Sequence, residues 1–469
     1  MTQQRQLSVN GRIGWSQFLT DTERLSYSNI QSVGSTPDSL YNNMKDSRYY
    51  TGELGIEWQQ ALNKQWQWRI LSLNNVQNWF VNSDSNTQYP LATFNHASNL
   101  RFDEHKSEHV LRTLLSFSPN SSQTMTHQEY GFETAYSELS SWLTLGKQDG
   151  LLAGNAISSK SYSKAQEQRN EVFANFSWQF SHVNVETGFA AEYSQIKVDG
   201  DNNDQQSLFF FKPSLSLVYN ASQQTQYRFN LRRSVGQLNF GDFAASADLV
   251  NDRTFSGNPQ LRPDTNIRAA IAMDYRFAKK GALSVELYHE WRQHVLEQII
   301  LPSGTHAWGN AGDATVQGLN TSLNLPLSPW LPDAQLSIVA NLMTADFNDP
   351  ITDETRPLTE LKNPIVSADF RQNLSELRIS WGLGYQAYTE SEVFYVNEYN
   401  LYRTLSNWTA FIESFVFKDL KVRLSAQSSA EVQWDRMLYK NSRRGDLNRQ
   451  ERTERHRGPY LSLTISQSF

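Results

Sequence analysis

Cysteine is missing from this chain of 469 residues, which excludes disulfide bridges and cysteine-ligated metal centres. Long apolar stretches are missing as well: nowhere do eighteen apolar residues follow one another, as a helix that crosses a membrane requires. The sequence therefore argues against a helical membrane protein. Residues 1–6 also lack the apolar core of a signal peptide, so we expect that any export leader was removed or lies upstream.

A net charge of -6 argues against nucleic acid as a partner. The chain has no Gly-x-Ser-x-Gly elbow for a nucleophile. His105 with His109, and Glu286 with His289, have the spacing of metal ligands on a helix, but four residues of extended strand separate side chains by roughly 13 Å. The segment 199–204 resembles the start of a calcium loop without its glycine, and we interpret it as a hairpin turn. We predict no catalytic, cofactor or metal residues, and no enzyme activity.

Aromatic residues, by contrast, make up 12% of the chain, with 13 Trp, 20 Tyr and 25 Phe. They occur in long runs where apolar and polar residues alternate, the pattern of a strand with one apolar face. The longest run extends from Lys421 to Trp434, and similar runs occur at 377–387, 267–277, 336–342 and 183–193. Most reach the ~9–11 residues that a strand needs to cross a bilayer.

Short and long connections alternate between these runs, as they do in outer-membrane barrels. Short turns are expected near 63–64, 181–182, 221–224, 279–281, 373–376 and 418–419, and long polar loops at 20–48, 80–107, 147–168, 238–265, 347–361, 390–406 and 437–454. We predict an all-β fold, an antiparallel transmembrane β-barrel of about 18 strands over residues 1–469, located in the cell outer membrane. The short turns would lie in the periplasm and the long loops outside the cell.

The final strand ends on Phe469 after alternating Leu461, Leu463 and Ile465. A terminal aromatic residue of this kind resembles the signal by which the barrel-assembly machinery recognises outer-membrane proteins. The alternative is a last strand that happens to end in an aromatic residue.

Two segments carry a more specific likeness. Residues 212–243 read as a strand that rises into a loop, and the loop continues with Phe-Ser-Gly-Asn-Pro-Gln-Leu-Arg-Pro-Asp at 255–264. This segment resembles the Gly-Asn-Pro-x-Leu-x-Pro-Glu motif of TonB-dependent receptors, with Asp264 in place of the usual glutamate. Residues 310–318 resemble a second motif of that family, Asn-x-Gly-x-Ala-x-x-x-Gly. The matching residues of the first motif are Gly257, Asn258, Pro259, Leu261 and Pro263.

The resemblance implies an outer-membrane receptor that imports a scarce nutrient, such as a siderophore, cobalamin or a saccharide. In that family a plug fills a 22-stranded barrel and a TonB-ExbB-ExbD-type energy-coupling complex acts on it. No plug-like segment or coupling box precedes Leu7, so we expect that the plug and some first strands are missing through truncation; a derivative of the family without a plug is the alternative. A passive porin, with a lumen constricted by an infolded loop, is the alternative, and an outer-membrane protease or lipase is a third.

Candidate ligand residues lie where one strand meets the long loop at 238–265. They are Arg232, Arg233, Gln237, Asn239, Phe240, Asp242 and Phe243. They could bind an unknown small molecule or form a structural rim. A basic run from Arg443 to Arg457, interleaved with acidic residues, could contact lipopolysaccharide phosphates or an anionic ligand, or could pair with its own acidic residues.

Overall fold

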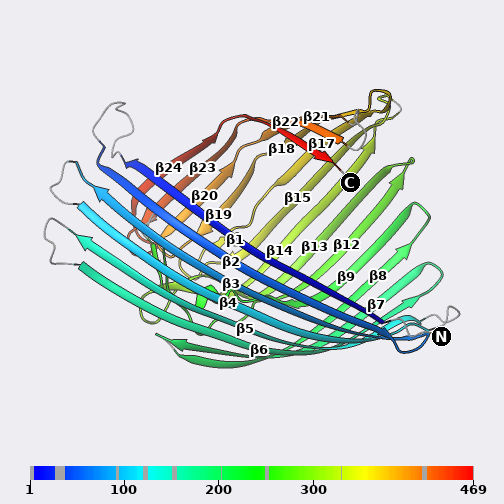
Figure 1. The fold of residues 1–469 in the computed structure, drawn as a ribbon, viewed down its shortest axis with the longest axis horizontal. Coiled ribbons are helices and arrows are strands. Elements are labelled where there is room, and N and C mark those ends of the chain that lie inside the picture. The colour runs from blue at the N-terminus through cyan, green and yellow to red at the C-terminus, as the bar shows by residue number, and fades with distance from the viewer. Residues whose placement is uncertain are drawn as a thin grey trace.

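The structure is a computed structural model that describes residues 5–26, 37–90, 95–119, 125–149, 156–201, 203–248, 253–328, 330–414 and 420–467. These residues are almost entirely β strands (Figure 1). The strands are β1 Arg5–Ser26, β2 Ser39–Ala61, β3 Trp66–Gln88, β4 Asn95–Phe117, β5 Met125–Asp149, β6 Ala156–Gln179, β7 Val183–Gly200, β8 Asp204–Asn220, β9 Thr225–Val235, β10 Ser246–Asp248, β11 Arg253–Phe255, β12 Thr265–Phe277, β13 Gly281–Ile300, β14 His306–Pro326, β15 Ala334–Asn348, β16 Thr355–Arg356, β17 Ile365–Leu374, β18 Ile379–Gln386, β19 Thr389–Phe394, β20 Glu398–Thr404, β21 Asn407–Ser414, β22 Leu420–Gln427, β23 Ala430–Tyr439, β24 Leu447–Arg457 and β25 Tyr460–Gln467. Two short 3-10 helices, η1 Phe240–Phe243 and η2 Ser375–Leu377, complete the described elements. No helix within these ranges is long and apolar enough to cross a membrane.

One antiparallel sheet of 19 strands forms the wall. Leaving out the two-residue β16, the wall has 18 strands that pair in chain order, which confirms the predicted count; they are β1 to β9, β12 to β15, β17, β18, β21, β22 and β25. The sheet curves into a shell with hairpin turns at one end and longer connections at the other (Figure 1). We call these the short-turn end and the long-loop end. Within the described residues, no pairing joins β1 to β25, so these strands are the two edges of the sheet.

The strands on the N-terminal side are longer than predicted. β1 to β6 each contain between 22 and 25 residues and extend through most of the segments 20–48, 80–107 and 147–168, which we had expected to be loops. That expectation was wrong because these segments are rich in polar residues and lack a continuous apolar face, although their backbones continue the strands of the wall. The predicted turns at 63–64, 181–182, 221–224, 279–281 and 373–376 are confirmed as strand ends, and 418–419 lies outside the described residues.

The long alternating run from Lys421 to Trp434 was wrongly predicted to be one strand. It is divided at Ser428 into β22, which pairs with β21 and β25 in the wall, and β23, which pairs with β20 and β24. The hydroxyl of Ser428 accepts a hydrogen bond from the backbone N–H of Trp408 at 2.9 Å, where the chain leaves the wall. Alternation continues across the break, so periodicity could not reveal it.

The strands β19, β20, β23 and β24 form a separate four-stranded sheet at the long-loop end, which we call the loop sheet (Figure 1). It contains the segments 390–406 and 437–454 that were predicted to be loops. The hairpins leave the wall after β18 and β22 and return at β21 and β25.

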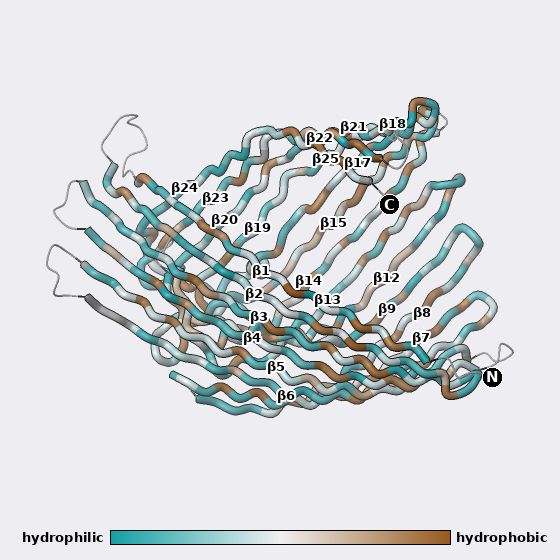
Figure 2. Tube along the Cα trace, in the orientation of Figure 1, coloured by the Kyte–Doolittle hydropathy of each residue, from teal (hydrophilic) through white to brown (hydrophobic). Residues whose placement is uncertain are grey.

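The two faces of the wall differ in what covers them. On one face Val81, Leu100 and Leu143 are buried and pack against Ala245 and Ala247 of the β9–β12 connection. The same connection reaches β20 of the loop sheet, which extends from the wall between β18 and β21, so it runs inside the curved sheet and this face is the inner one. Residues of the other parity form the outer face, where large apolar side chains are exposed. The colours in Figure 2 show hydrophobic and hydrophilic residues following one another along the strands.

The outer face carries apolar residues of the predicted alternation, among them Phe189, Tyr193 and Ile271, and Leu54 and Ile56 of β2 are exposed in the same way. The inner face carries ion pairs instead, such as Arg268 with Glu286 at 2.6 Å. An apolar exterior with a polar interior is the arrangement of a barrel that stands in lipid and encloses water.

Candidate functional site: the mouth of the barrel

The connection between β9 and β12 crosses the mouth of the barrel at the long-loop end, and we call its described residues, 236–248 and 253–264, the strap. Its first part forms η1, where Phe240 and Phe243 are buried with Leu139, Ile196 and Leu261. Its later part reaches the loop sheet, where Arg253 pairs with Glu398 and the Phe255 ring stacks on Tyr395 with centroids 5.7 Å apart. The strap therefore joins the wall at β5 and β7 to the loop sheet across the lumen.

The two motifs singled out in the sequence hold the strap in place by contacting each other. The side-chain amide of Asn258 donates to the carbonyl of Trp308 at 2.9 Å. Asn310 accepts from the backbone N–H of Arg262 at 2.9 Å and donates to its carbonyl at 2.8 Å. Leu261 is fully buried, and a Cβ on Gly257 would lie 2.1 Å from the carbonyl oxygen of Phe243, so only glycine allows this approach. Pro259 and Pro263 fix the backbone on either side of Leu261.

The candidate ligand residues divide into three groups. Phe240 and Phe243 are buried in the strap's own core, while Gln237 and Asn239 are exposed. Asn239 caps η1: its side-chain oxygen accepts from the N–H of Gly241 at 3.2 Å and its amide donates to Asp242 at 3.2 Å. Burial raises the pKa of Asp242 to about 6, against the effect of this hydrogen bond.

Arg232 and Arg233, neighbours at the end of β9, lie on opposite faces of the wall. Arg233 pairs with Ile267 and shares its outer face, where it donates to the carbonyl of Phe211 at 3.2 Å. Arg232 pairs with Arg268 and lies on the inner face. We predicted both residues at one site, but consecutive side chains of a strand point to opposite faces of the sheet.

Arg232 lines a recess of about 680 Å³ in the inner wall, which we call the lumen recess. Its other charged lining residues include Arg112, Glu171, Glu186 and Lys212, and serine, asparagine and phenylalanine residues also line it. The recess also borders the strand position of Arg233. Lys212 pairs with Glu171 and with Glu192, the latter at 2.6 Å. Arg232 forms no ion pair with any residue in the described ranges, so its guanidinium is available to a ligand or to another protein segment.

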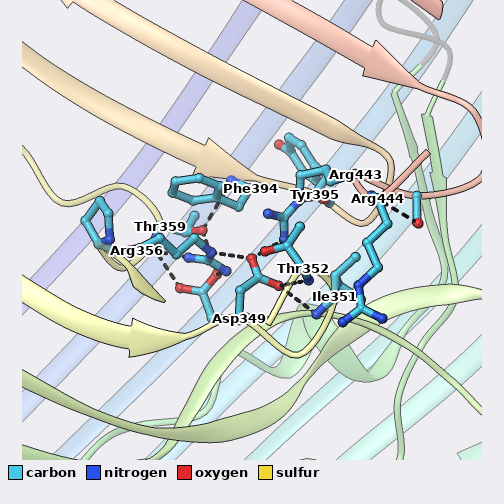
Figure 3. Close-up of polar contacts among 12 residues, drawn as sticks. Asp349, Ile351, Thr352, Arg356, Thr359, Phe394, Tyr395, Arg443 and Arg444 are labelled. Atoms are coloured by element: carbon cyan, nitrogen blue, oxygen red, sulfur yellow. Dashed lines mark hydrogen bonds and ion pairs between the residues drawn. The ribbon is translucent and has the colours of Figure 1, made fainter. Parts of the chain in front are cut away.

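A buried ionic network fixes the loops beside the strap (Figure 3). Asp349 pairs with Arg356 at 2.5 Å and with Arg443, and it accepts the backbone N–H of Ile351 at 2.7 Å. Arg356 also pairs with Glu297 at 3.0 Å. Burial alone would raise the pKa of Asp349, but the hydrogen bonds from Arg356 and Ile351 and the two guanidinium charges outweigh it and hold the pKa below its ordinary value.

The same network accounts for much of the basic run. Arg443 is buried against Asp349, and burial lowers its pKa despite that partner. Of the others, Arg444 pairs with Asp353, Arg449 with Glu451 at 3.0 Å and Arg452 with Asp435 at 2.7 Å. Most of the run thus pairs with acidic residues of the chain.

One cluster that the sequence did not reveal could hold a metal ion. Glu431, Glu454 and His456 face one another on β23 and β24, with one ligand atom from each within 4.8 Å of the others. Strand pairing creates it, because Glu431 is directly opposite His456. His105 and His109, by contrast, each contact a different asparagine on β3.

Comparison with known proteins identifies the architecture. The family model described as "TonB dependent receptor-like, beta-barrel" matches residues 2–452. The chain belongs to the TonB-dependent receptor family. No curated protein has a matching sequence.

Solved receptors of this family have a similar fold. The siderophore receptor PiuA from Acinetobacter baumannii superimposes with a TM-score of 0.55 at 9% identity, over 99% of this chain and 79% of that one. The ferric yersiniabactin uptake receptor FyuA from Yersinia pestis gives 0.55 at 8% identity, over 99% and 80%. At such identities the likeness concerns the fold. This TonB-dependent receptor barrel is an outer-membrane protein, and its predicted assembly signal at Phe469 lies outside the described residues.

Proposed function

We propose that this receptor barrel imports a scarce nutrient complex, of the ferric siderophore class, across the outer membrane, with energy supplied by a TonB-ExbB-ExbD-type complex. Family membership over residues 2–452 carries the proposal. The ligand class is supported by the siderophore receptors whose fold the chain shares.

The mouth of the barrel suits capture from outside the cell. In this proposal the long-loop end faces the medium, where the strap, the loop sheet and the Asp349 network form a rigid rim. The lumen recess with Arg232 lies on the inner wall, where its guanidinium can contact the anionic groups that chelate iron. A wall of fixed strands supplies no energy, so directed transport needs a plug in the lumen on which the coupling complex pulls.

A passive porin is the second candidate, and the strap is the observation that favours it, because an infolded loop is what constricts a porin lumen. Energy dependence separates the two. We expect cells that carry the full-length gene product to take up at least one radiolabelled ferric siderophore, and to stop when a protonophore is added or the coupling protein is deleted. Uptake that continues in de-energised cells, together with a steady conductance in planar bilayers, would show that the protein is a passive porin.

A further inference from the structure

A second recess, of about 350 Å³, lies across β2, β3 and β4. Its lining includes Asp46, Arg48, Tyr50, Phe80, Arg101 and Asp103. Neither the proposed transport function nor the sequence motifs assign a role to this recess.

This recess is on the outer face of the wall. Arg48 and Tyr50 have the parity of the exposed Leu54 and Ile56, whereas the adjacent Ser47 is buried on the inner face. On β3 and β4 the same division holds, because Val81 and Leu100 beside the recess residues pack against the strap side. Strand pairing aligns the three strands: Arg48 is opposite Phe80, and Phe80 is opposite Asp103.

The recess lies at the level where hydrocarbon gives way to headgroups. Arg48 is 13 positions from Ala61, the short-turn end of β2 (61 minus 48). At ~3.4 Å per residue and a tilt of about 45°, this places it roughly 30 Å above that end, just beyond an apolar band ~25 Å tall. Exposed aromatic residues mark the same boundary: Trp15 pairs with Tyr50, and Trp142 pairs with Asp103. Aromatic belts occupy the membrane interface in outer-membrane barrels.

Two guanidinium groups are available in this recess. Arg48 contacts Asp46 through Nε at 3.1 Å and Nη2 at 2.7 Å, which leaves its remaining donors free. Arg101 forms no ion pair with the residues that the structure describes. Guanidinium groups bind phosphate with bidentate geometry. Asp46 and Asp103 would repel a bare phosphate, but carboxylate oxygens bind the divalent cations that accompany one.

We propose that this recess binds the phosphorylated glycolipid headgroup of the outer leaflet, with Arg48 and Arg101 on a phosphate and Asp103 on a divalent cation shared with it. The aromatic pair Tyr50 and Phe80, with ring centroids 6.1 Å apart, forms the floor against which the sugar and acyl junction packs. The inference depends on the orientation proposed above, with the long-loop end outside, but not on the nutrient transported.

Native mass spectrometry of the full-length protein in detergent tests the proposal, with bisphosphorylated lipid A as the probe in the presence of Mg²⁺. We expect the wild type to retain lipid A at least roughly tenfold better than the double variant Arg48→Gln/Arg101→Gln, and better than it retains dephosphorylated lipid A. Chelation of Mg²⁺ should weaken binding to a similar extent. The variant Arg5→Gln is the matched control, because Arg5 is exposed on the same face at the short-turn end.

Equal retention by the double variant and by Arg5→Gln, or equal retention of phosphorylated and dephosphorylated lipid, would overturn the proposal. If the double variant does not fold, as judged by heat-modifiable mobility on gels, Arg101→Gln alone gives the readout. The charge-retaining variant Arg101→Lys should restore part of the affinity. Because lipid retention is measured without uptake, a failed transport proposal would leave these outcomes unchanged.

Discussion

Arg253 on the strap and Glu398 on β20 form an ion pair between segments 145 residues apart in the chain. The Nε–Oε2 distance is 3.2 Å, and the Arg253 guanidinium also lies over the Tyr395 ring, 4.4 Å from its centroid. Glu398 is 3% exposed and accepts a second guanidinium, Arg436, at 2.8 Å. Burial alone would raise the pKa of Glu398, but hydrogen bonds from Arg436 and Arg253 and their charges hold it below its ordinary value. This relationship makes the strap part of the rim and not a free loop.

Removing one partner of that pair should therefore release the strap. We expect Glu398→Ala to destabilise the mouth by about 3–5 kcal/mol, because it removes the buried carboxylate that two guanidinium groups share and leaves them only their outer partners, Asp248 for Arg253 and Glu451 for Arg436. Hydrogen exchange of backbone amides in residues 253–264 should accelerate while the amides of β7 and β8 keep their protection. The control is Lys440→Ala, which removes an exposed pair with Asp446 at 3.8 Å and should leave exchange unchanged. Unaltered protection in Glu398→Ala would mean that the pair does not hold the strap.

Gly257 offers a steric test of the same segment. A side chain there would collide with the backbone carbonyl of Phe243, which cannot move without displacing η1. We expect Gly257→Val to cost roughly 1–3 kcal/mol and to lower the midpoint of thermal unfolding. Gly52→Ala serves as the control, since a Cβ at that position meets no atom within 4 Å. Equal midpoints for the two variants would contradict the close approach seen at Gly257.

The sequence predicted the strands of the wall more accurately than the segments at the long-loop end. Long alternation predicted β7, β12, β15 and the final strand, because each of these strands has one apolar face toward lipid and one polar face toward the lumen. Above the membrane the outer face of a strand lies in water and needs no apolar residues, so the alternation weakens and the halves of β1 to β6 at the long-loop end were predicted to be loops. The division of the alternating run at Ser428 could not be predicted for a different reason, because only the change of pairing partner marks it.

The residues of the candidate site could also be predicted only in part. The resemblance located the strap motif, and the contact of Asn310 with Arg262 explains why both motifs occur together. Sequence reasoning missed Asp349, Glu297 and Glu398, whose partners lie between 7 and 145 residues away. No local pattern signals such ion pairs. Strand geometry does separate Arg232 from Arg233, because successive residues of β9 point to opposite faces of the sheet.

Asp242 should make the stability of the mouth depend on pH. Burial raises its pKa from 3.8 to about 6, so the folded protein favours the neutral carboxyl group. The resulting stability is fully present below pH 3.8, declines as the pH rises, and reaches its lower level above about pH 6. We expect the thermal midpoint of the wild type to fall between pH 4 and about 6, and that of Asp242→Asn to change less. Asp446→Asn, whose side chain is 87% exposed, is the control and should follow the wild type.

Arg232 and Arg233 give the sharpest test of the lumen recess, because the two substitutions differ by one position and by the face they alter. If the recess contacts the imported ligand, Arg232→Ala should reduce the initial uptake rate roughly tenfold, which corresponds to the loss of about 1.4 kcal/mol from one charged contact. Arg233→Ala removes a guanidinium from the outer face, where Arg233 bonds to the carbonyl of Phe211, and should leave uptake within about twofold of the wild type. Both rates are compared at equal surface abundance, measured by heat-modifiable mobility and antibody labelling. Equal losses in the two variants would show that position along β9, and not the lumen face, determines the effect.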